Sequence, residues 1–158
     1  MRTRRAALRL GAAMFAALAL PRAGTAAGGA TLPRPASLAA EIERAVAGGK
    51  ALVVMVSLEG CPYCKLVRES YLAPLRAGGQ PVVEIEMARS LPLVDAQGRA
   101  STHEQVVRAL GVRVAPTVLF LGRRGAEAAP RITGMPLPDF YGAYLQERVE
   151  AGNRAVSG

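Results

Sequence analysis

The hydrophobic pattern changes period several times along the chain, and each change predicts the end of one element and the start of another. Four segments are predicted as helices: 37–46, 62–73, 102–110 and 137–149. Four apolar or alternating runs are predicted as strands: 51–57, 81–87, 117–121 and 131–133. Helices and strands alternate at first, and two strands then follow each other before the last helix. This order predicts an α/β domain with a central mixed sheet of about four strands flanked by helices.

Individual residues support the boundaries of these elements. Residues 51–57 form a continuous apolar run rich in β-branched side chains, which is typical of a strand buried on both faces. Ser37 is suited to cap the first helix, and Pro74 is expected to end the second. Residues 89–101 form a connection longer than usual, which is either a loop that docks a partner or a plain solvated loop.

The first 27 residues are predicted to be an export signal peptide. They combine a basic head, a mildly apolar run at 10–20 and small residues up to Ala27. The apolar run is well short of the roughly 20 residues that cross a bilayer as a helix, so a retained membrane anchor is the weaker alternative. Residues 3–9 resemble the twin-arginine export motif except that Ala7 takes the usual aromatic position, and the general secretory route is the alternative. Either route predicts a periplasmic protein whose signal is removed.

The remaining segments are predicted to be one folded domain with unstructured flanks. Residues 28–36 form a Gly/Pro/Ala linker with nothing to pack, 37–150 form the domain, and 151–158 form a disordered tail. The net charge of +8 is misleading, because five basic residues lie within the first 27 and the rest of the chain has 15 Lys and Arg against 12 Asp and Glu. This excess of basic residues is small, and the sequence shows no basic stripe interleaved with aromatic residues. Both observations argue against a nucleic-acid partner.

The chain has two cysteines, Cys61 and Cys64, at the junction between a predicted strand and a predicted helix. Unpaired N–H groups at the helix start would stabilise a thiolate at Cys61, and Pro62 suits the first helical position because its missing N–H would have been unpaired. Cys64, one turn later, is expected to be more buried. A thiolate at Cys61 would attack a disulfide, and Cys64 would then resolve the mixed disulfide. The spacing therefore predicts a redox pair.

Two other roles for the cysteines are less favoured. A purely structural disulfide across this small loop would restrict the unfolded chain only modestly. A metal site needs about four ligands, whereas the chain offers two cysteines and His103, which is predicted to be an ordinary surface histidine. We therefore expect neither a metal nor another cofactor.

Two separate motifs in the right order resemble the thioredoxin superfamily. Residues 61–65 (CPYCK) follow a buried strand, and residues 114–117 (VAPT) precede another one. Gly134 follows the last strand, before a final amphipathic helix. The resemblance extends from Ser37 to about Glu150. It implies the thioredoxin fold and a thiol-disulfide oxidoreductase.

The same resemblance assigns roles to several residues. Pro116 would be a cis proline beside the dithiol and part of the catalytic centre, although a simple strand-entry proline is the alternative. The backbone of Ala115 would pair with an extended substrate segment. Gly134 and Met135 would flank this groove, unless they form only a turn into the last helix. Residues 62–63 complete the expected substrate-binding set.

The chain departs from typical thioredoxins at two positions near the cysteines. Gly60 takes the place of a tryptophan, and Met55 takes the place of a buried acid that accepts the proton of the second cysteine. Glu59 or water would have to serve instead, and a solvated loop acid is the alternative for Glu59. Lys65 would help to lower the pKa of the first cysteine, or is simply a solvated helix lysine.

The dipeptide between the cysteines, residues 62–63, is typical of glutaredoxins, but residues 133–136 look thioredoxin-like and the expected export argues against a glutathione cycle. We expect a monomeric reductase of specific exported partner proteins, similar to those linked to cytochrome c maturation or sulfur oxidation. A membrane thiol carrier would supply its electrons. The alternatives are a disulfide oxidant or isomerase and a non-catalytic binding module with a structural disulfide.

Overall fold

The computed structural model describes residues 30–136 and 138–158, so the predicted export signal at 1–27 lies outside the described residues. The α-helices are α1 (Leu38–Ala47), α2 (Pro62–Val67), α3 (Ala73–Ala77), α4 (His103–Ala109) and α5 (Tyr141–Ser157). The strands are β1 (Leu52–Ser57), β2 (Val82–Glu86), β3 (Pro92–Val94), β4 (Ala100–Thr102), β5 (Thr117–Leu121) and β6 (Glu127–Thr133). Shorter helical segments of other types are η1 (Arg68–Leu72), η2 (Arg123–Gly125) and η3 (Pro138–Phe140).

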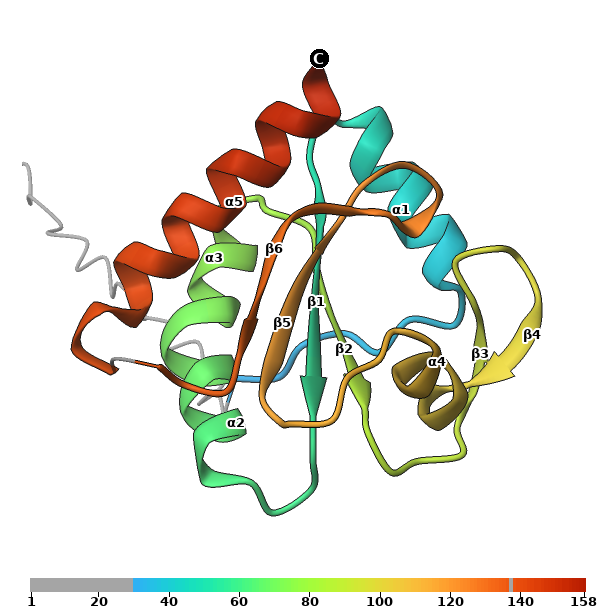
Figure 1. The fold of residues 1–158 in the computed structure, drawn as a ribbon, viewed down its shortest axis with the longest axis horizontal. Coiled ribbons are helices and arrows are strands. Elements are labelled where there is room, and N and C mark those ends of the chain that lie inside the picture. The colour runs from blue at the N-terminus through green and yellow to red at the C-terminus, as the bar shows by residue number, and fades with distance from the viewer. Residues whose placement is uncertain (1–29, 137) are drawn as a thin grey trace, which may run out of the picture.

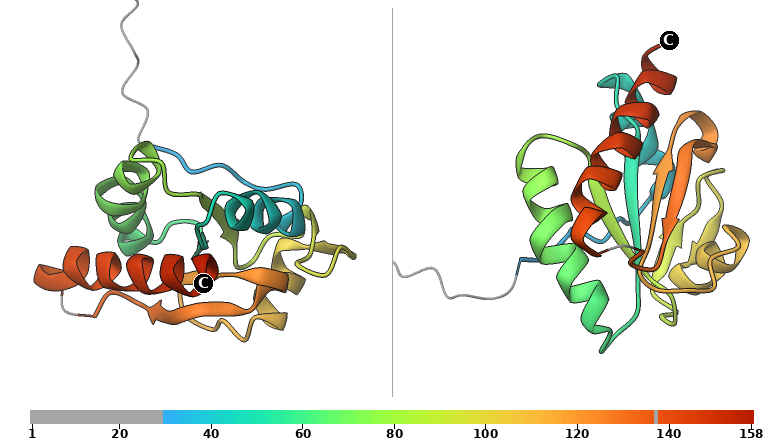
Figure 2. Two further views of the ribbon diagram at one scale, coloured as in Figure 1. Left: turned by 90° about the horizontal axis from the view of Figure 1, so that it is seen from above. Right: turned by 60° about the vertical axis from the view of Figure 1, so that its left-hand side comes forward.

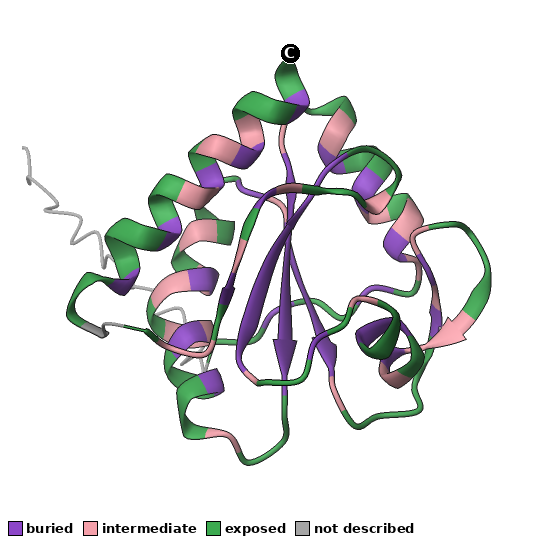
Figure 3. Ribbon diagram, in the orientation of Figure 1, coloured by how far each residue is buried: buried purple, intermediate pink, exposed green. Residues whose placement is uncertain are grey.

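The central sheet has the strand order β2-β1-β5-β6. Strand β1 runs parallel to β2 and antiparallel to β5, and β5 runs antiparallel to β6. The predicted mixed sheet of four strands is therefore confirmed. Every residue of β1 and β5 is buried, as the continuous apolar run at 51–57 predicts for a central strand (Figures 1 and 3).

Helices cover both faces of the sheet (Figure 2). Met55 and Phe120 point to the face covered by α2, α3 and α5, where they share one apolar core with Cys64. Val54 and Leu119 point to the opposite face, where α1 and α4 cover a second core. Helix α2 follows the carboxyl end of β1 and packs on the first of these faces, so its cysteines lie at that end of the strand.

The second helical segment continues past Pro74, where the sequence pattern predicted its end. Segment η1 is a π turn, in which Ala73 donates a hydrogen bond to the carbonyl of Arg68 five residues earlier. The proline follows this change of hydrogen-bond register, so α3 continues the path of α2 and η1 to Ala77.

The long connection at 89–101 contains a β-hairpin rather than an irregular loop. Strands β3 and β4 pair in antiparallel register. The Asp95 carboxylate closes the turn by accepting hydrogen bonds from the backbone N–H groups of Gln97 and Arg99, both at 2.9 Å. Gly98 takes a positive φ of 80°, which this tight turn requires.

Both predicted unstructured flanks are wrong where the structure describes them. In the segment predicted as a linker, Leu32 is buried, and the Pro33 carbonyl accepts a hydrogen bond from the N–H of Glu84 at 2.9 Å. The segment thus bonds to β2 on the edge that faces away from β1. In the segment predicted as a disordered tail, α5 continues to Ser157, because Val156 is buried and Asn153 Oδ1 accepts a hydrogen bond from the N–H of Ala51.

Within the described residues, no helix combines the length and the apolar character needed to cross a membrane.

Candidate functional site

Cys61 and Cys64 form a disulfide at the start of α2. Cys61 is the N-cap residue of this helix, its Sγ accepts a hydrogen bond from the N–H of Cys64 at 3.1 Å, and Pro62 takes the first helical position. Cys61 is partly exposed, whereas Cys64 is buried in the core. This difference in access fits attack by the first cysteine and resolution by the second.

Gly60 gives the chain its turn into the helix. Its φ of 73° lies in the left-handed region, and the N–H of Cys61 donates a hydrogen bond to the carbonyl of Leu58 at 3.3 Å. A residue with a Cβ would be strained in this conformation. The backbone thus accounts for glycine where typical thioredoxins carry tryptophan.

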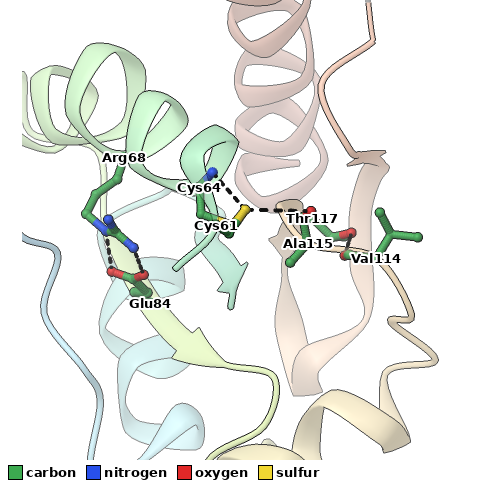
Figure 4. Close-up of a disulfide and its surroundings, with 7 residues drawn as sticks. All are labelled: Cys61, Cys64, Arg68, Glu84, Val114, Ala115 and Thr117. Atoms are coloured by element: carbon green, nitrogen blue, oxygen red, sulfur yellow. Dashed lines mark hydrogen bonds and ion pairs between the residues drawn. A yellow bond between two sulfur atoms is a disulfide. The ribbon is translucent and has the colours of Figure 1, made fainter. Parts of the chain in front are cut away.

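The loop before β5 lies directly beside the disulfide (Figure 4). The peptide bond between Ala115 and Pro116 is cis, as the resemblance implied, and the Ala115 carbonyl lies 4.0 Å from Cys61 Sγ. The Thr117 hydroxyl donates a hydrogen bond to the carbonyl of Val114 at 2.7 Å. The Thr117 side chain thus helps to fix the loop, and the loop presents the backbone carbonyl of Ala115 to the sulfur.

The structure brings most of the predicted substrate-binding residues to this loop. The N–H of Gly134 donates a hydrogen bond to the carbonyl of Pro116 at 2.7 Å. Met135 and Ala115 are partly buried against the same apolar core as Cys61. Residues 62–63 lie on the exposed start of α2, where 59% of Tyr63 is accessible to solvent.

The two residues predicted to support the cysteines are exposed. Lys65 lies on the open side of α2, in a cleft that Cys61 also lines. Glu59 lines the same cleft, its side chain is 80% exposed, and its carboxylate lies 3.9 Å from a guanidinium nitrogen of Arg89. Met55, at the position of the usual buried acid, is fully buried in the apolar core that contains Cys64.

This cleft lies on the β2 side of Cys61 and has a volume of about 640 Å³. It is lined by residues from the segment before α1, the end of β1, the start of α2, η1, β2 and the turn after β2: Ala30, Thr31, Leu32, Arg34, Ser57, Leu58, Glu59, Gly60, Cys61, Pro62, Lys65, Arg68, Glu69, Glu84, Glu86 and Arg89. Sequence reasoning identified only the part nearest the cysteines.

Two buried carboxylates form the inner part of the cleft. Glu84 accepts two hydrogen bonds from the Arg68 guanidinium, at 2.9 and 2.5 Å (Figure 4), and this bond to Glu84 raises the pKa of Arg68 although burial opposes the rise. Glu86 is paired with both Arg34 and Arg89. Burial alone would raise the pKa of Glu86, but the hydrogen bonds and charges of the two arginines outweigh it and lower the pKa.

The prediction of a surface histidine is wrong. His103 is buried at the start of α4, and its Nδ1 accepts a hydrogen bond from the backbone N–H of Glu86 at 3.0 Å. The pKa of His103 is lowered overall, chiefly by burial. The charge of Glu86 opposes this shift, and the charge of Arg34 adds to it. Among the described residues, no three His, Cys, Asp or Glu side chains are grouped so that they could hold a metal ion.

Solved structures with a similar fold include several thioredoxins. The solution structure of a thioredoxin from Thermus thermophilus has a TM-score of 0.50 and 21% sequence identity, over 77% of this chain and 92% of that one. The periplasmic thioredoxin SoxS from Paracoccus pantotrophus, solved in its reduced form, has a TM-score of 0.44 and 21% identity, over 65% of this chain and 98% of that one. Thioredoxin NaTrxh from Nicotiana alata has a TM-score of 0.47 and 18% identity, over 77% and 98%.

A sequence comparison with curated proteins gives no match. The family model of the thioredoxin-like domain matches residues 38–148, which is most of the chain. This match agrees with the sheet topology, the CXXC pair at the start of α2 and the cis proline beside it. The chain therefore belongs to the thioredoxin-like family and is a thiol-disulfide oxidoreductase.

Proposed function

We propose that this protein is an exported reductase that acts in the periplasm on the disulfides of a few specific partner proteins. The observation that carries the assignment to thiol-disulfide exchange is the contrast between a partly exposed Cys61 at a helix N-terminus and a buried Cys64. The basic head and apolar run of residues 1–27 support export. Partners of the kind that serve cytochrome c maturation or sulfur oxidation fit this location.

The reaction begins with the reduced dithiol. The Cys61 thiolate attacks one sulfur of the partner's disulfide, a Cys61–partner disulfide forms, and the other partner sulfur leaves as a thiolate that takes up a proton. Cys64 then loses its proton and attacks Cys61 Sγ, which releases the second partner sulfur and leaves the Cys61–Cys64 disulfide seen in the structure. A dithiol on a membrane carrier would return the two electrons by the same exchange.

The residues around the sulfur position the partner. The N–H groups at the start of α2 stabilise the thiolate of Cys61. The Ala115 backbone, held by the bond from Gly134 to Pro116, offers an edge along which an extended partner segment can pair. Because Met55 is apolar, Cys64 has no acid at that position, and its proton would pass to water or to Glu59.

Trapping tests this proposal. In the Cys64→Ser variant the mixed disulfide on Cys61 cannot be resolved, so partner proteins should accumulate as adducts that a reducing agent releases and mass spectrometry identifies. The Cys61→Ser variant is the matched control and should trap nothing. Adducts on Cys61→Ser but not on Cys64→Ser would reverse the assignment of the nucleophile.

The direction of electron flow needs a second measurement. Equilibration of the wild-type protein with glutathione buffers gives the reduction potential of the Cys61–Cys64 pair. A reductase should have a lower potential than the partner captured by trapping. A higher potential would favour the oxidant reading, and a disulfide that exchanges with no partner or model compound would favour a purely structural role.

A further inference from the structure

Cys61 has a second neighbour besides the cis-proline loop, namely the charged cleft on the β2 side. We propose that this cleft is a specificity site that binds an acidic segment of the partner protein next to its disulfide. The inference rests on the proposed function, because it concerns which disulfides the protein selects.

The position of the cleft makes it accessible to a partner bonded to Cys61. Cys61, Pro62 and Lys65 line the cleft together with residues 30–32. The volume of about 640 Å³ is within the range of ligand-binding cavities. A partner held at Cys61 by a disulfide thus has neighbouring residues close enough to enter the cleft while another segment lies along the Ala115 loop.

The charges inside the cleft are arranged asymmetrically. The side chains of Glu84 and Glu86 are only 5% and 8% exposed, and both are already paired with guanidinium groups. By contrast, Arg34 is 56% exposed and Arg89 is 50% exposed. An incoming group therefore meets the exposed arginine donors first, and the carboxylates beneath them are already paired with guanidinium groups.

Two further cleft residues, both acidic, have to be weighed against these exposed arginines. Glu69 is partly exposed, and the exposed Glu59 makes only a long contact of 3.9 Å with Arg89. Lys65 adds an exposed positive charge at the mouth. A partner carboxylate can form charge-assisted hydrogen bonds with Arg89 in place of the loose Glu59 contact. A basic partner segment would find the two buried acceptors, Glu84 and Glu86, already paired, and could pair only with Glu59 and Glu69 at the surface of the cleft.

Peptide binding tests the cleft without requiring the reaction. Three synthetic peptides would share one extended sequence with serine in place of cysteine, and would differ only in the two residues beside that serine: acidic, amide or lysine. Titration of each into the oxidised ¹⁵N-labelled protein should move the amide signals of residues 30–32, 34 and 84–89. We expect the acidic peptide to bind several-fold more tightly than the amide peptide at low salt, and this advantage to shrink at high salt.

Matched variants identify the groups responsible. In the double variant Arg34→Gln/Arg89→Gln, the ratio of the affinity for the acidic peptide to that for the amide peptide should fall towards one. The control variant Arg108→Gln, on the exposed surface of α4, should keep the wild-type ratio. Glu59→Gln should increase the preference for the acidic peptide. Because this variant leaves the buried carboxylates paired, it still tests the proposal if the double variant does not fold. Equal binding of the acidic and amide peptides to the wild type, or a preference that survives loss of both arginines, would overturn the proposal.

The corresponding disulfide peptides separate this inference from the proposed function. If the cleft selects substrates, the reduced protein should reduce the acidic disulfide peptide several-fold faster than the amide one. If the acidic peptide binds more tightly but no peptide is reduced, the cleft is an acidic-segment site and the reductase assignment fails. If all peptides are reduced and bound equally, the reductase assignment stands and the cleft is not a specificity site.

Discussion

The two sides of Cys61 are built from different chemistry. On the β5 side, Ala115 and Gly134 are small, and the groups near the sulfur are backbone carbonyl and N–H groups held in a fixed loop. On the β2 side, the cleft is formed by charged side chains from segments far apart in the chain. Backbone atoms can pair with any extended segment, whereas charged side chains distinguish one segment from another. The β5 side of the Cys61 sulfur can therefore bind any extended partner segment, and the β2 side can select among partner segments by their charge.

The largest effect is expected from breaking the buried pair on the β2 side. Arg68→Ala would leave the Glu84 carboxylate buried without its partner, and removing one member of a buried ion pair costs about 3 kcal/mol or more in the free energy of unfolding. Urea unfolding followed by circular dichroism measures this loss. A loss of this size would show that the charged residues on the β2 side stabilise the fold in addition to their proposed role in recognition.

Two further variants check the cause of that loss. Arg68→Ala/Glu84→Gln removes the uncompensated charge and should regain much of the lost stability. Arg108→Ala breaks the exposed pair between Arg108 and Glu104 and should cost less than about 1 kcal/mol. If Arg68→Ala costs no more than Arg108→Ala, the buried pair does not stabilise the cleft in the way we describe.

A smaller effect is expected on the β5 side, from Gly134→Ala. Gly134 has a φ of 69°, and a Cβ placed there would contact nothing within 4 Å, so the cost is purely conformational, about 1 kcal/mol. Because the N–H of Gly134 holds Pro116, the variant should slow reduction of acidic and amide peptides by the same factor.

The matched control for this variant is Gly78→Ala, at a glycine with a φ of −74° away from the cysteines. It should leave the reduction rates of both peptides unchanged. If Gly134→Ala alters the preference between the acidic and amide peptides, the two sides of Cys61 are not independent.

The β5 side was largely predictable from the sequence, because its information is local. The CXXC spacing, Pro116 and the alternation of helices with strands each occupy a few consecutive residues. The four-stranded mixed sheet and the placement of Cys61 at a helix N-terminus follow from these patterns. Gly60 stood out as a departure from thioredoxins, and its reason became visible only in its positive φ.

The β2 side was not predictable, because its information is non-local. Arg34 and Glu86 are 52 positions apart, and an alternating strand such as β2 ordinarily turns its acids to solvent. The Gly/Pro-rich composition of 28–36 hid the fact that Leu32 fills the core and that the backbone covers the edge of β2. In the same way, no local pattern showed that Asn153 would bind the end of α5 to Ala51.

The smallest effect is expected in the pH dependence of stability, through His103 next to the cleft. His103 lies beneath Glu86, and burial, together with the charge of Arg34, lowers its pKa from the ordinary 6.5 while Glu86 opposes the shift. As the pH falls from 7 towards 5, the unfolded chain takes up the histidine proton before the folded protein does, so stability must fall in this range. The lowered pKa of Glu86 removes stability only at lower pH, below its ordinary value of 4.5, so the two contributions separate.

His103→Asn isolates the histidine contribution. The asparagine side-chain oxygen can accept the same hydrogen bond from the N–H of Glu86 but does not titrate. The variant should be less stable overall, because the smaller side chain fills less of the buried site, yet its urea midpoint should change less between pH 7 and pH 5 than that of the wild type. Parallel profiles for the two proteins would mean that another group causes the pH dependence, and the buried His103 would then support Glu86 only as a hydrogen-bond acceptor.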